Sequence, residues 1–213
     1  MYTDEFTHRQ IMMERFYEYH HYRSDSPLSV DFHQHAFYEI YIFISGDVSY
    51  IIEGRTYNLR PGDILLTNNS DIHRPEIHPS RSPYERIVIW LDDSFFNWLR
   101  DVGDDLTACF HDASNRNYRL FRPTETQLLQ IQSVCHTIEK ERTNKRLGNR
   151  VMAYSSIIEI LVLLSRAYYE IADSAHHSVT ENQQINQIVS YINNHYNEDL
   201  NLEHLADQFY LSK

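Results

Sequence analysis

The stretch between residues 33 and 73, HQHAFYEIYIFISGDVSYIIEGRTYNLRPGDILLTNNSDIH, constrains the fold more than any other part of the chain. Three of the protein's five glycines (Gly46, Gly54 and Gly62) fall in it at intervals of eight residues. The runs between them are rich in β-branched and aromatic residues, which is typical of short antiparallel strands joined by tight turns. We therefore predict a small antiparallel barrel, whose interior can enclose a ligand.

Four potential metal ligands lie at the two ends of this stretch: His33, His35 and Glu39 open it and His73 closes it. A straight strand rises about 3.3 Å per residue, which would put Glu39 roughly 13 Å beyond His35. One ion has bonds of only about 2.0–2.2 Å, so these residues can converge only if the chain bends between residues 36 and 38. Three imidazoles and a carboxylate suit Zn, Ni, Fe or Mn.

The same stretch resembles the cupin family. Residues His33, His35, Glu39 and Gly46 match its first motif, and Gly62 and His73 match parts of its second. Other motif positions depart from the pattern, at Pro27, Asn68, Ser70 and Ile77. The resemblance implies a double-stranded β-helix, the antiparallel barrel of that family, with the four ligands at a metal or effector pocket.

The residues expected to line a ligand pocket share one strand face or the barrel mouth; they are His33, His35, Glu39, Tyr41, Phe43 and His73. Trp90 can add an apolar wall. The alternative is that the histidines and Glu39 only hydrogen-bond to one another and to the backbone, without metal. Arg74 and Arg86 can pair with an anionic effector or with surface carboxylates, and we expect the surface pairs.

Strand and helix patterns continue on both sides of this region. Residues 1–30 are expected to add an edge strand or two. In YERIVIWL (84–91), Ile87, Ile89 and Leu91 alternate with Val88 and Trp90, which predicts a strand buried on both faces. A short helix in DDSFFNWLRD and a polar loop in HDASNRNYRL are expected next.

Helical periodicity begins after Pro123, where Thr124 and Gln127 form a potential capping box. The expected buried stripe of this helix is Leu128, Ile131, Cys135 and Ile138. A second helix, from about 151 to 171, is apolar around much of its circumference. We expect it to pack against both the barrel and a second subunit, which predicts a homodimer formed through the helices of 124–171.

The last residues, INQIVSYINNHYNEDLNLEHLADQFYLSK, resemble the start of the DNA-binding domain of AraC-type transcriptional regulators. That resemblance rests on a Leu-x-x-Leu-Ala helix beginning at Leu202, followed by Tyr-Leu-Ser. The family's recognition helix would follow Lys213, so no DNA-binding residue is assigned. The expected division is a cupin sensor (1–110), a helical dimerisation segment (111–172), a linker (173–183) and a truncated helix-turn-helix start (184–213).

Composition excludes some functions. A net charge of −11 argues against nucleic-acid binding by this chain alone, because phosphate neutralisation requires a basic surface. No run reaches the length of a membrane span, and the N-terminus has no signal pattern. Two cysteines, Cys109 and Cys135, make no disulfide framework, which favours a reducing cytoplasm.

We therefore interpret the chain as the sensor and dimerisation part of a ligand-responsive regulator, not an enzyme, with operator DNA bound only by the full-length protein. One alternative is a metal-dependent cupin enzyme of dioxygenase or isomerase type, using the four ligands named above. Another is an interaction protein that dimerises with intact regulators. That hypothesis predicts a soluble monomer on substitution of Leu161 by Asp.

Overall fold

The computed structural model describes residues 3–26, 28–116, 118–144, 146–176, 188, 191–192, 195 and 200–209. Its strands are β1 (Tyr17–Ser24), β2 (Tyr38–Ser45), β3 (Val48–Ile52), β4 (Arg55–Asn58), β5 (Ile64–Thr67), β6 (His73–Ile77), β7 (Tyr84–Leu91) and β8 (Leu120–Phe121). Its helices are α1 (Asp93–Val102), α2 (Ala108–Asn115), α3 (Glu125–Thr143), α4 (Asn149–His176) and α6 (Leu202–Gln208).

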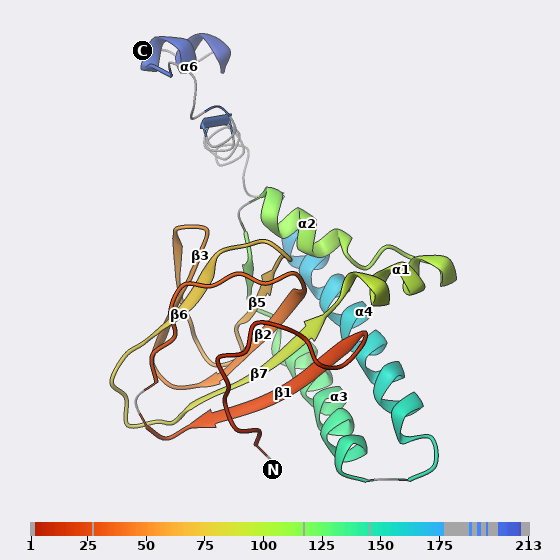
Figure 1. The fold of residues 1–213 in the computed structure, drawn as a ribbon. Coiled ribbons are helices and arrows are strands. Elements are labelled where there is room, and N and C mark those ends of the chain that lie inside the picture. Colours follow the sequence, from red (N-terminus) through yellow and green to blue (C-terminus); the bar gives the residue numbers. More distant parts are fainter. Residues whose placement is uncertain are drawn as a thin grey trace.

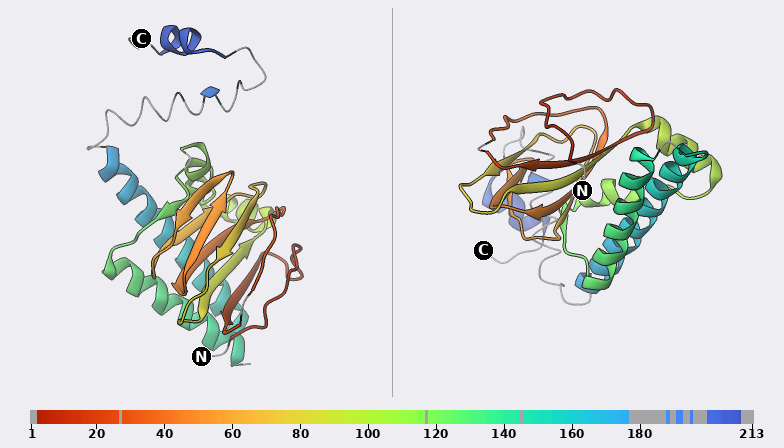
Figure 2. Two further views of the ribbon diagram at one scale, coloured as in Figure 1. Left: turned by 90° about the vertical axis from the view of Figure 1, so that its left-hand side faces the viewer. Right: turned by 90° about the horizontal axis from the view of Figure 1, so that it is seen from below.

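The strands form two antiparallel sheets that face each other as a barrel (Figure 1). One sheet has the order β1-β7-β2-β5-β8 and the other β4-β3-β6. The N-terminal lead-in supplies β1 at an edge, as predicted. Helices α3 and α4 lie side by side against the outer side of the larger sheet, which Figure 2 shows from below.

Tight turns occur at the predicted glycines. Glu53 and Gly54 both have positive φ, +48° and +74°, and they join β3 to β4 as a two-residue hairpin that favours such backbone angles. Gly46 has a φ of +119°, and a Cβ there would lie 3.2 Å from the Cα of Tyr84. The spacing of the glycines thus reflects backbone conformations that other residues adopt only with strain.

Strand β7 separates two apolar cores. Its residues Ile87, Ile89 and Leu91 belong to a cluster shared with the helices, whereas Val88 and Trp90 belong to the cluster inside the barrel. The predicted strand buried on both faces is therefore confirmed. Because β7 pairs with β1 on one side and with β2 on the other, its register fixes which side chains point into the barrel.

The predicted start of α3 is confirmed in detail. Thr124 Oγ1 accepts from the backbone N–H of Gln127, and the Gln127 side chain accepts from the N–H of Thr124. Ile131, Cys135 and Ile138 are buried along the helix. Burial raises the pKa of the Cys135 thiol to about 12, so it is an apolar core residue and not a reactive one.

Two boundaries differ from the sequence-based expectation. Residues 108–115 form α2, although the sequence 111–120 was expected to be a loop. Three side chains of α2, Cys109, Phe110 and Ala113, are buried and hold this polar segment against the core. Helix α4 runs to His176, so the first part of the expected linker 173–183 is helical.

Helix α4 contains a segment, Asn149–Glu170, whose length and composition would suffice to cross a membrane. Such a segment is weak evidence for a span, because core helices share these properties. Its residues Ile157, Ile160, Leu161 and Leu164 are buried in the core shared with the barrel. The apolar circumference that suggested a second subunit is thus partly covered within one chain.

In the C-terminal region, the helix expected near Leu202 is present as α6, with Asn201 as its N-cap. Residues 177–187, which include most of the expected linker, and residues 210–213 lie outside the described residues, as do several positions between them. The expected helix-turn-helix start remains a prediction.

Candidate functional site

A cavity of ≈ 390 Å³ lies between strands of the barrel and the N-terminal residues. Strands β1, β2, β3, β6 and β7 and the N-terminal residues contribute to its wall. The lining residues are Phe6, Thr7, His8, Arg9, Gln10, Tyr22, Val30, Asp31, His33, Glu39, Tyr41, Tyr50, Pro75, Tyr84, Arg86, Val88 and Trp90. This combination of aromatic rings with a few polar groups is typical of a small-molecule site.

Tyrosines form much of the wall. The hydroxyl groups of Tyr41 and Tyr84 are 2.9 Å apart and hydrogen-bond to each other. The hydroxyl of Tyr50 donates to Oε1 of Glu39 at 3.2 Å. Burial raises the pKa of all three phenols, so they stay neutral at pH 7 and can both donate and accept hydrogen bonds.

Glu39 is a buried carboxylate on β2. In addition to the Tyr50 contact, its Oε2 accepts from Nε1 of Trp90 at 2.8 Å and lies 3.5 Å from Nε2 of His35. Burial alone would raise the pKa of Glu39, but the nearby His35 and His73 and the Trp90 hydrogen bond lower it to about 2. The cavity therefore contains a negative charge at neutral pH.

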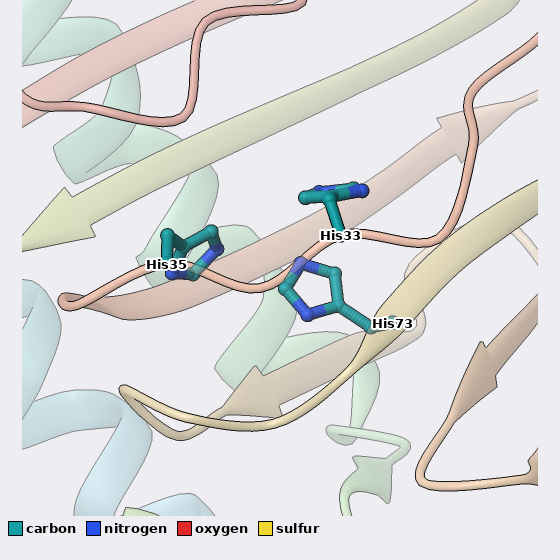
Figure 3. Close-up of side chains that lie close together, drawn as sticks. All are labelled: His33, His35 and His73. Atoms are coloured by element: carbon teal, nitrogen blue, oxygen red, sulfur yellow. The ribbon is translucent and has the colours of Figure 1, made fainter.

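The three histidines predicted as ligands lie together (Figure 3), and His33 lines the cavity. One ring nitrogen from each of His33, His35 and His73 lies within 4.8 Å of the other two. The backbones of His33 and His73 form an antiparallel bridge, with N···O distances of 3.1 and 2.9 Å. The chain bends at residues 36–37, which is the bend required for these residues to converge with Glu39.

Backbone hydrogen bonds orient all three rings in the same way. The Nδ1 atoms of His33, His35 and His73 lie 2.8–2.9 Å from carbonyl oxygens, which can only accept, so each Nδ1 carries the proton. The Nε2 atoms of His35 and His73 are buried and make no hydrogen bond with the described residues, although Nε2 of His35 lies 3.5 Å from Oε2 of Glu39. Burial lowers the pKa of His73 to about 4, which keeps its ring neutral.

The predicted site residues divide into two groups. His33, Glu39 and Tyr41 line the cavity, together with Trp90. His35 and His73 are buried next to it, while Phe43 is buried within the barrel cluster and is not part of the lining. Glu39 adjoins the histidines at His35, but its two oxygens accept hydrogen bonds from Tyr50 and Trp90.

One expectation is wrong. Arg86 was expected to pair with surface carboxylates, but its side chain is buried, with the residue 2% exposed, and it lines the cavity. The sequence pattern could have predicted this position, since Arg86 is two and four residues before Val88 and Trp90 and therefore lies on the same face of the strand. Arg74 does pair at the surface, 3.7 Å from Glu76.

The N-terminal arm, residues 3–16, closes part of the cavity and was not predicted to belong to the site. Its Arg9 lies over the Trp90 ring, 5.1 Å from the centroid, and forms an ion pair with Glu18 of β1. Glu18 also accepts from the backbone N–H groups of Met13 and Glu14. Burial alone would raise the pKa of Glu18, but Arg9 and these N–H groups lower it to about 2.

Substitution of Glu18 by Gln should therefore destabilise the protein by about 1.5–3 kcal/mol at pH 7, the usual range for hydrogen bonds to a charged group. Because the folded-state pKa lies below the ordinary 4.5, this contribution is fully present above pH 4.5 and is lost as the pH falls towards 2. Urea unfolding of both proteins across this range tests it. A difference that stays constant down to pH 2 would contradict the assignment.

Comparison with known proteins identifies similar chains. Residues 16–161 match the family described as AraC-like ligand binding domain. Curated relatives include the HTH-type transcriptional activators RhaS of Enterobacter sp. (strain 638), 23% identical over 181 residues, and of Salmonella heidelberg (strain SL476), 26% identical over 183 residues. Each match covers 84% of this chain, and the chain spans only 61% of the length of these relatives.

The solved structures matched include two bacterial proteins. The DMSP lyase DddQ from Ruegeria pomeroyi DSS-3 is 25% identical with a TM-score of 0.33, covering 38% of this chain and 40% of that one. A Cupin 2 conserved barrel domain protein from Salinispora arenicola CNS-205 is 19% identical with a TM-score of 0.34, covering 40% and 71%.

Proposed function

The chain belongs to the AraC-like ligand-binding domain family, and from this premise we propose that it is the sensor part of a ligand-responsive transcription regulator. The predicted α+β class with a cupin barrel agrees with the family and with the two facing sheets. The observation that carries the proposal is the cavity inside the barrel, whose wall combines aromatic rings with hydrogen-bonding groups. A small effector bound there is the expected input.

We propose that effector binding in this sensor controls DNA binding by a longer protein. The relatives matched are named as HTH-type transcriptional activators, and this chain spans 61% of their length. We propose that α3 and α4 mediate homodimerisation, since Leu129, Val151 and Met152 on these helices are exposed apolar residues that a second subunit can cover. A regulator of this kind acts in the cytoplasm and needs no catalytic residue.

A cavity-blocking variant tests the effector site. Thermal unfolding is measured with a panel of monosaccharides, sugar acids and aromatic acids. A binding compound should raise the Tm of the wild-type protein. Val88→Phe, which places a ring in the cavity, should abolish that rise, and Gln132→Ala, at an exposed position on α3, should retain it. A panel without any stabilising compound, or a shift that survives Val88→Phe, would refute the proposal.

The three histidines support a second candidate, a divalent metal site. Their Nδ1 atoms face backbone carbonyl oxygens, which leaves the Nε2 atoms for a metal, and those of His35 and His73 are buried without a hydrogen-bond partner among the described residues. Two nitrogens bound to one tetrahedral ion lie about 3.4 Å apart, so ring nitrogens that now lie within 4.8 Å of one another would have to approach by about an ångström or more. A bound ion would act as a Lewis acid at the end of the cavity where His33 lies.

Metal removal and re-addition tests this site. Chelator-treated protein should gain about 2.7 kcal/mol of stability when Zn, Ni, Mn or Fe is added at one hundred times its dissociation constant. His33→Ala should lose this gain in stability, because it removes one of the three ligand nitrogens. The variant should still fold, since His33 is half-buried and its replacement leaves the barrel core intact. His136→Ala, at an exposed position on α3, is the matched control. Equal stabilisation of wild type and His33→Ala would exclude the cluster.

A further inference from the structure

Arg86 is a buried cation in the middle of the barrel wall. On β7 it lies opposite Tyr22 of β1 and Phe43 of β2. Its parity is that of Tyr84, Val88 and Trp90, all of which line the cavity. Placing a guanidinium inside an aromatic barrel is unfavourable unless something compensates its charge.

The contacts of Arg86 within the described residues are neutral. Its NH1 donates to Oγ of Ser24 at 2.9 Å and to the carbonyl oxygen of Tyr84 at 3.3 Å. Its guanidinium carbon lies 4.1 Å from the ring centroid of Tyr84, 4.9 Å from that of Tyr22 and 5.0 Å from that of Phe6. No carboxylate oxygen of the described chain lies within 4.0 Å of its nitrogens.

Arg119, the other buried arginine of the described chain, has the carboxylate partner that Arg86 lacks. Arg119 is as buried as Arg86, and it makes a two-point ion pair with Asp71 at 2.8 and 2.9 Å. Arg9, which also lines the cavity, is paired with Glu18. Arg86 has no such partner among the described residues, and its side chain borders the cavity, so the place where a counter-charge can bind is the cavity itself.

We propose that the effector carries a carboxylate that pairs with Arg86, and that it is a small hydroxylated acid of the sugar-acid type. A monoanion fits better than a phosphate dianion, because the single guanidinium of Arg86 can balance only one negative charge. The hydroxyl pair of Tyr41 and Tyr84 keeps one O–H free to donate to a hydroxyl group of the ligand, and the oxygen of Tyr50, whose O–H donates to Glu39, can still accept. This inference rests on the proposed effector site and specifies its chemistry.

Matched probes separate the carboxylate from the rest of the ligand. D-Glucuronate is compared with D-glucose, and D-galacturonate with D-galactose, by thermal shift and titration calorimetry, with sodium chloride as the salt control. At least one acid should bind at least about tenfold more tightly than its neutral partner, as expected for a buried charge pair. Arg86→Met should remove that preference. Arg74→Met, which removes a surface arginine paired with Glu76, should keep it.

The stability of the ligand-free variant provides a second readout. Since Arg86→Met removes a buried charge without an ionic partner, its Tm should equal or exceed that of the wild type. A large loss of stability would indicate a structural role and overturn the inference. Equal binding of acids and neutral sugars would overturn it as well, but would leave the proposed effector site intact. If no acid binds, the inference fails, and the Val88→Phe panel decides separately whether the cavity binds anything.

Discussion

Replacing Arg119 with Ala is expected to lower the free energy of unfolding by about 3–5 kcal/mol, the cost of breaking a buried ion pair on one side. Arg119 Nε and NH2 donate to the two carboxylate oxygens of Asp71, at 2.8 and 2.9 Å. Both side chains are buried. The substitution would leave the Asp71 carboxylate in the protein interior without its counter-ion, and urea unfolding measures the loss.

The same change should disturb the histidine cluster. Asp71 accepts from the backbone N–H of Asn68 through its side chain, and its carbonyl oxygen accepts from Nδ1 of His73. A reorganised Asp71 would therefore release the ring of His73 from its fixed orientation. The gain in stability on adding Zn, Ni, Mn or Fe should therefore be smaller for Arg119→Ala than for the wild-type protein.

Arg100→Ala is the matched control. Arg100 of α1 also pairs with an aspartate, Asp105, at 3.7 Å, but about half of each side chain is exposed. Exposed ion pairs contribute about 0–1 kcal/mol, so this variant should unfold close to the wild type. Equal effects of the two substitutions would show that burial does not determine the contribution of the Arg119 pair.

Substituting Leu161 by Asp should unfold the protein and not yield the soluble monomer that the interaction-protein hypothesis predicts. Leu161 is 1% exposed and belongs to the core between the barrel and the helices of its own chain. An unpaired carboxylate there, added to the loss of an apolar side chain, should cost more than about 4 kcal/mol. Circular dichroism and the elution volume of the expressed variant test this result.

Val151→Asp places the same charge on the same helix at an exposed position. It should leave the stability of one chain nearly unchanged, because surface substitutions usually fall within about 0.5 kcal/mol. If α4 joins two subunits as proposed, it should also weaken the dimer in analytical ultracentrifugation. A stable, folded Leu161→Asp variant would contradict the core assignment, whatever its oligomeric state.

Local rules predicted much of the fold. The alternation in residues 84–91 gave the correct faces of β7, and the Thr124–Gln127 box gave the start of α3. These features depend on residues close together in the sequence, so the spacing of apolar residues and the preferences of helix-capping residues suffice to predict them. Helix α2 was missed because only three of its residues are buried, which is too few to produce a recognisable period.

The candidate site was predicted only in part, because its polar contacts join distant segments. Residues 33–39 and His73 could be grouped through the motif spacing. The ion pair of Asp71 with Arg119, 48 residues apart, has no local signature. Neither does the position of the arm residue Arg9 over Trp90. For Arg86 the pattern was readable, but the expectation that an arginine lies at the surface outweighed the parity of the strand.

Strand β7 has a consequence for how binding can be transmitted. Arg86 and Trp90 contact the cavity, while Ile87 and Ile89, between them in sequence, pack in the core that includes α3 and α4. Adjacent residues of one strand share a backbone, and close-packed cores resist deformation. A ligand that displaced this backbone would therefore also displace the packed helices, and through β7 alone it would change the surface on the opposite side of the larger sheet.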